Sequence, residues 1–113
     1  RQEVDEAVKA IGNYSVEQRD KALKRVKTAI DNLDKRIEAL ETQIENRWSQ
    51  MDQKARQEAR STLKTLRKER NEMAEGYGGM QHSSINAWDH VKKGFIDSYK
   101  ALSKAYEKAV EEF

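Results

Sequence analysis

Cysteine and proline are absent from this chain of 113 residues, and glycine occurs only five times. The absence of cysteine excludes disulfide bonds, thiolate catalysis and zinc sites built on sulfur. Because proline is absent and glycine is scarce, few positions force a helix to end. Together with 37% charged residues, this composition is typical of long helices or a coiled coil.

An excess of one charge is also lacking, as is any long hydrophobic run. The 22 basic and 20 acidic residues leave a net charge of +2, so no global field attracts nucleic acid or an anionic membrane. No apolar segment approaches the roughly 18 residues needed to cross a bilayer. The composition therefore indicates a chain that does not span a membrane.

Residues suited to catalysis are scarce. The two histidines, His82 and His90, do not form the paired motifs that place two metal ligands on one helical face. We therefore predict a protein that is not an enzyme and has no cofactor and no small-molecule substrate. The one metal site to consider joins Met73, Met80 and His82, whose thioether and imidazole groups suit Cu(I). Met73 also fits the apolar pattern of the long helix, and Met80 can cover the open end of that pattern.

The dominant pattern is a stretch from residue 15 to residue 75 that contains no glycine or proline. Apolar residues recur along it at steps of three and four, as in a coiled coil. After Trp48 the pattern contains an extra four-residue step, a stutter that unwinds a supercoil without breaking the helix. We call the first half of this pattern the seam, which consists of Leu23, Val26, Ile30, Leu33, Ile37, Leu40 and Ile44.

Shorter helices are predicted on both sides of this stretch. Apolar positions predict a first helix over residues 2–11, and Ser15 with Gln18 matches a capping box at the start of the long helix. Three glycines within residues 76–79 predict a loop over 76–83.

The last helix is predicted over residues 84–113. At about 45 Å it is half as long as a helix over 15–75, so it covers the second half of the long helix and leaves the seam bare. Its apolar face includes an aromatic strip, formed by Trp88, Phe95, Tyr99, Tyr106 and Phe113. The predicted fold class is all-α, a long-helix coiled-coil hairpin with a short N-terminal helix in one domain, 1–113.

The charge distribution indicates what covers the seam. Residues 31–45 contain five acids and two bases, whereas residues 54–70 contain seven bases and two acids. An antiparallel pairing centred near Ser49 lays the acidic half along the basic half and aligns the apolar positions of both.

Two structures satisfy this pairing. In the first, the helix continues through residues 46–52 and pairs with a second copy, giving an antiparallel homodimer that exchanges helices. In the second, the chain turns within residues 46–52, where Ser49 with Asp52 can cap a new helix, giving a monomeric three-helix bundle. We favour the dimer, because a sharp turn is normally marked by glycine or proline and this segment has neither.

Basic residues recur every four positions in the second half of the long helix. They can track phosphates or anionic headgroups, or form the flank of a coiled coil that faces carboxylates, which is the interpretation we favour. The lack of interleaved aromatic residues counts against binding of single-stranded nucleic acid. We call this set the basic stripe, which consists of Arg56, Arg60, Lys64 and Lys68.

From about Val26 onward the chain resembles a group of short bacterial coiled-coil proteins of the stress-response or apolipoprotein-like type. The likeness lies in a long helix rich in Glu, Lys, Arg and Ala, a short interruption, and the Ser-Ser-x-x-Ala-Trp opening at residues 83–88. Lys93-Gly94-Phe95 and Tyr99 follow at a spacing typical of that group. The segment before Val26 and the glycine-rich loop depart from the pattern. The resemblance implies a helical hairpin without established catalysis and supplies no catalytic residues.

We therefore expect a non-enzymatic bacterial structural or protein-interaction module, associated with stress or with the cell envelope. The alternative is a peripheral protein whose last helix lays its aromatic strip on a lipid surface or on misfolded clients. The expected partners are a second copy together with a protein or a membrane surface. Because the chain begins at Arg1 and lacks cysteine, we expect the periplasm in preference to the cytoplasm.

Overall fold

The computed structural model describes residues 2–113, and the all-α fold class is confirmed over this range. Two single turns of 3₁₀-helix, η1 (Val16–Gln18) and η2 (Trp48–Gln50), lie at the two ends of the second helix. The four α-helices are α1 (Gln2–Asn13), α2 (Arg19–Arg47), α3 (Gln53–Gln81) and α4 (Trp88–Glu112).

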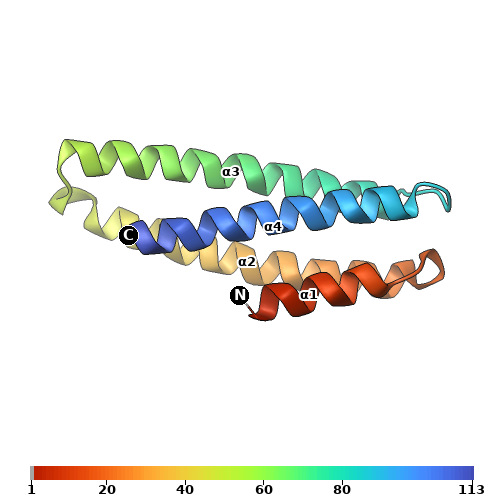
Figure 1. Cartoon of the computed structure of the whole chain (residues 1–113). Helices are drawn as coiled ribbons and strands as arrows, with labels where there is room; N and C mark the ends of the chain where they lie inside the picture. Colours follow the sequence, from red (N-terminus) through yellow and green to blue (C-terminus); the bar gives the residue numbers. More distant parts are fainter. Residues whose placement is uncertain (1) are drawn as a thin grey trace.

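The helices form an elongated up-down-up-down bundle of 52 × 22 × 16 Å (Figure 1). Each helix packs against the next one in the chain, and α1 also packs against α4. With 12 residues α1 is only about 18 Å long, compared with about 43 Å for α2 and α3. Beyond α1, α4 approaches α2 directly, and the backbone oxygen of Phe113 accepts hydrogen bonds from Arg47 Nη1 (3.0 Å) and Gln43 Nε2 (3.4 Å). The bundle thus has four helices at one end and three at the other.

The seam lies in the core of this single chain. Its members Val26, Leu33, Ile37, Leu40 and Ile44 are buried, and Leu23 and Ile30 are partly buried against the same cluster. Side chains of α3 and α4 complete that cluster, which corrects the expectation that the seam is left bare by the later helices. The residues that cover it include Ala59, Leu66, Met73, Met80, Phe95, Tyr99 and Leu102.

The prediction of one continuous helix over 15–75 is wrong. The chain leaves the helix after η2, with Met51 in an extended conformation (φ −82°, ψ 141°). Asp52 then caps α3, because its Oδ1 accepts a hydrogen bond of 2.7 Å from the backbone N–H of Ala55. The chain therefore turns within 46–52, as in the alternative structure, since the turn lets the two apolar halves bury each other without a second copy.

The prediction of a loop over 76–83 is also wrong, because α3 continues through the glycines to Gln81. A Cβ atom added to Gly76 would lie 3.1 Å from the Cα atom of Phe95 on α4. At Gly78 the same atom would meet nothing within 4 Å. Glycine at position 76 thus permits a close approach of two helices and does not reverse the chain.

The remaining helix boundaries differ less from the prediction. The chain reverses over residues 82–87, where Ser84 Oγ accepts a hydrogen bond of 3.2 Å from the backbone N–H of Ala87, and α4 begins at Trp88 instead of residue 84. The first helix extends to Asn13 instead of residue 11. The predicted capping box is present, and the backbone N–H of Ser15 donates to Gln18 Oε1 at 3.1 Å.

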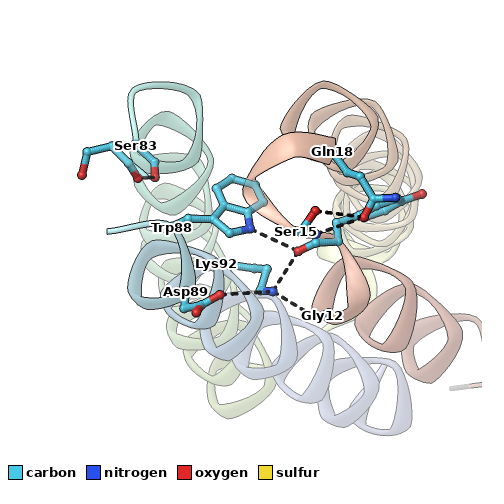
Figure 2. A network of polar contacts seen from close by, with 9 residues as sticks. Gly12, Ser15, Gln18, Ser83, Trp88, Asp89 and Lys92 are labelled. Carbon is cyan, nitrogen blue, oxygen red and sulfur yellow. Dashed lines mark hydrogen bonds and ion pairs between the residues drawn. The ribbon is translucent and has the colours of Figure 1, made fainter. Parts of the chain in front are cut away.

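Polar contacts from α4 hold the end of α1 in place (Figure 2). The indole N–H of Trp88 donates to the backbone oxygen of Tyr14 at 3.1 Å, and Lys92 Nζ donates to the same oxygen at 3.0 Å. Lys92 Nζ also donates to the backbone oxygen of Gly12 at 2.9 Å. Carbonyls at the C-terminus of a helix lack intrahelical partners and form the negative end of its dipole. Lys92, whose side chain is only 13% exposed, therefore supplies hydrogen bonds to carbonyl oxygens at the end of α1 that lack intrahelical partners.

Gly76→Ala and Gly78→Ala are expected to change stability in opposite directions. Alanine at position 78 should raise the free energy of unfolding by about 0.5–1 kcal/mol, because it favours helix and meets no neighbour. Alanine at position 76 should lower it by about 1 kcal/mol, because the helices must separate to admit the methyl group. Urea unfolding measures both values. Equal stabilisation by the two substitutions would contradict the close approach of α3 and α4.

Lys92→Met is expected to release α1 while the rest of the bundle stays folded. The substitution keeps the apolar stem and removes the charged hydrogen bonds to two carbonyls, a loss of about 1.5–3 kcal/mol. Hydrogen exchange should accelerate at the amides of α1 more than at those of α3. Lys93→Met, at the exposed neighbouring position, is the control. A similar response of both variants would argue against this role of Lys92.

Candidate functional site

The basic residues of α3 divide into those that face α2 and those that face solvent. Arg70 faces α2, where its Nε lies 3.0 Å from Asp34 Oδ1, its Nη1 lies 3.5 Å from Glu41 Oε1 and its Nη2 lies 3.9 Å from Glu38 Oε1. The Arg70 side chain is 28% exposed, so these charges are partly shielded from water. One arginine thus pairs the basic half with the acidic half in the antiparallel orientation that the charge distribution predicted.

The first two residues of the basic stripe contact an aromatic ring. Arg56 Nε donates to the backbone oxygen of Trp48 at 3.0 Å, and its Cζ lies 5.4 Å from the centre of the indole ring. Arg60 Cζ lies 5.1 Å from the same ring. Cation–π contacts of this kind contribute about 0.5–1 kcal/mol at exposed sites. Arg56 and Arg60 therefore fasten η2 onto α3.

The other two residues of the stripe, Lys64 and Lys68, are exposed. They share one helical face because they are four residues apart. That face is opposite to the buried Leu66, because residues two apart point to nearly opposite sides of a helix. Arg60 and Arg67 are exposed beside them. The outer side of α3 therefore presents a convex surface with several cations.

The residues of the hypothetical copper site occupy different environments. Met73 and Met80 are 1% and 0% exposed within the core, whereas His82 is exposed at the C-terminal end of α3. Binding of Cu(I) to both thioethers would disrupt their packing. In the part of the chain that the structure describes, no group of three or more histidine, aspartate or glutamate side chains is arranged to hold a metal ion.

The aromatic strip of α4 faces inward. Trp88, Phe95 and Tyr99 are buried, Tyr106 and Phe113 are partly buried, and the rings of Phe95 and Tyr99 stack with their centres 5.9 Å apart. In this fold the strip forms core. Binding of lipid or misfolded clients through it would require α4 to leave the bundle.

A polar cleft of about 280 Å³ lies where α1 meets α2 and α4. Arg25, Arg36 and Tyr99 line it together with acids of α1, and Arg36 forms an ion pair with Glu3. Burial raises the pKa of the Tyr99 hydroxyl, and the positive charges of Arg36 and Arg25 oppose this increase. Sequence reasoning missed this cleft, because no local pattern places Tyr99 beside two arginines of another helix.

The sequence also did not predict the specific contacts of Trp48 with two arginines of α3 or those of Lys92 with the end of α1. In a straight helix Trp48 lies two turns or more from Arg56 and Arg60, so only the turn brings the three together. Lys92 has the same local pattern as the exposed lysines of α4. The one signal in the sequence was that Lys92 follows Trp88 by four residues, which places both side chains on the same face of a helix.

Comparisons with protein families, with characterised proteins and with solved structures gave no match to this chain. Across residues 2–113, no helix has both the length and the apolar character that crossing a membrane demands.

Tyr99 is expected to make the protein less stable in alkali. Because its pKa is raised in the folded state, the unfolded chain ionises first, near pH 10. The contribution of Tyr99 to the free energy of unfolding is unchanged below that pH, and it is lost as the pH rises through the higher pKa of the folded state. Urea unfolding at about pH 8 and pH 11 should show a smaller alkaline loss for Tyr99→Phe than for the parent protein. An identical loss would mean that Tyr99 ionises equally in both states.

Proposed function

We propose that the protein is a non-enzymatic interaction module that binds an acidic protein surface through the outer side of α3. The observation that carries this proposal is the exposure of Arg60, Lys64, Arg67 and Lys68 on one convex helical surface. Such a surface suits a macromolecule that lies along the helix, and charge complementarity gives orientation and fast association.

The surroundings of these cations favour a protein over a membrane. The exposed neighbours Gln57, Ser61 and Asn71 are polar, whereas a helix that inserts into a lipid interface needs aromatic or aliphatic side chains beside its cations. The pairing of Arg70 with three acids of α2 is an example within this chain of a basic face of α3 meeting an acidic helix.

The biological setting we propose is a bacterial stress response or the cell envelope. The support for it is the resemblance of residues 83–88 and the following helix to short bacterial coiled-coil proteins.

Charge reversal on α3 tests the proposal. Lys64→Glu, Arg67→Glu and Lys68→Glu combined should weaken binding of a fluorescent polyglutamate peptide by about tenfold or more, because three ion pairs of about 0.2–1 kcal/mol become repulsions. Arg56 and Arg60 are left in place because both contact the ring of Trp48. Fluorescence anisotropy at low and physiological salt measures the affinity.

The matched control is Lys100→Glu, Lys104→Glu and Lys108→Glu on α4, which changes the net charge by the same amount at exposed positions. Equal weakening by both triple variants would show that net charge alone determines binding. Tighter, stripe-dependent binding to phosphatidylglycerol vesicles or to duplex DNA would reject an acidic protein as the partner.

A further inference from the structure

The molecule consists of two helical hairpins joined by one short turn. The first hairpin contains α1 and α2, and the second contains α3 and α4. The turn around Met51 connects the two hairpins, at the end of the bundle opposite to the chain reversals that follow α1 and α3 (Figure 1). Contacts between the hairpins run from α2 to α3, from α1 to α4 and from α2 to α4. Each hairpin can therefore move as a unit if the turn opens.

Two contacts between the hairpins are centred on this turn in the sequence. Arg70 pairs with Asp34, and the midpoint of these two positions in the sequence is residue 52. The bond from Lys92 to Gly12 has the same midpoint. If α2 and α3 formed one straight helix, a twofold axis near Asp52 would bring the same residues of a second copy into the same positions.

The turn itself lies close to a helical conformation. Only Met51 and Asp52 are outside helical structure, and the backbone of Trp48 is already helical (φ −54°, ψ −45°). Residues 46–52 contain no glycine or proline. Straightening breaks the Asp52 cap and the bond from Arg56 to the Trp48 carbonyl, and the backbone hydrogen bonds of a continuous helix replace them.

We propose that the turn over Trp48–Asp52 is a hinge at which two copies of this chain exchange their α3–α4 hairpins. In the resulting antiparallel homodimer, α2 of each copy packs against α3 of the other through the contacts that close the single chain. The closed chain and the exchanged dimer then differ mainly at the hinge, so protein concentration sets their balance.

Gln53→Pro tests the hinge. Residue 53 is the first residue of α3 and follows Asp52 in an extended conformation (ψ 174°), where proline is well accommodated. In a straight helix the same proline is interior, so it should raise the dimer dissociation constant by about a hundredfold or more. Combined Met51→Ala and Asp52→Ala, which removes the cap, should lower that constant.

Sedimentation equilibrium after refolding at high protein concentration measures both effects. The parent protein and the control Gln53→Ala should contain a species of twice 13.1 kDa, and Gln53→Pro should contain only the single chain. A mass of 13.1 kDa at every concentration, including that of the capless variant, would overturn the proposal. A dimer that Gln53→Pro leaves unchanged would show that the copies associate through other surfaces.

Crosslinking gives an independent readout. The chain contains no cysteine, so Asp34→Cys and Arg70→Cys can be introduced into separate copies that are refolded together and treated with a short bis-maleimide. The exchanged dimer places these two positions side by side, and a heterodimeric crosslink is expected. Asp34→Cys alone should form none, because its two copies would lie about 54 Å apart along the straight helix. Absence of the mixed crosslink would contradict the exchange.

Discussion

The structure depends on burial of the apolar seam of α2. Full burial of a valine, leucine or isoleucine contributes about 1.5–3 kcal/mol, and five seam residues are buried. Exposed ion pairs contribute about 0.2–1 kcal/mol each, and helix propensities differ by tenths of a kcal/mol for ordinary residues. The seam therefore outweighs the preference of residues 46–52 for a continuous helix, and the chain turns so that α3 and α4 can cover it.

Polar contacts then determine which antiparallel arrangement the helices adopt. Arg70 aligns α3 with the acids of α2, and Trp88 and Lys92 place α1 in the groove between α2 and α4. Each contact satisfies a group that would be costly to bury alone, such as a carbonyl at the end of a helix. Hydrophobic burial is nondirectional, so these few directional contacts fix the register.

The distribution of side chains between the core and the surface indicates which residues are available for function. The aromatic strip of α4 packs in or against the core, and both methionines near the end of α3 are buried. The groups most suited to binding lipid or a soft metal are therefore largely absent from the surface. Arg56 and Arg60 stabilise the turn through Trp48. The exposed cations farther along α3 are available to a partner, which is the basis of the proposed interaction surface.

The sequence by itself determined the helical content, the identity of the seam, the capping box at Ser15 and the antiparallel pairing of the acidic and basic halves. These features depend on helical periodicity and on residues within one or two turns of each other, so they can be read from local spacing. The position of the chain reversals required the tertiary structure. Trp48–Asp52 turns without glycine, whereas the glycines of α3 remain helical and Gly76 admits Phe95. Only the tertiary structure assigns partners to Trp48, Lys92 and Tyr99, because their contacts join residues from separate helices whose packing no local pattern encodes.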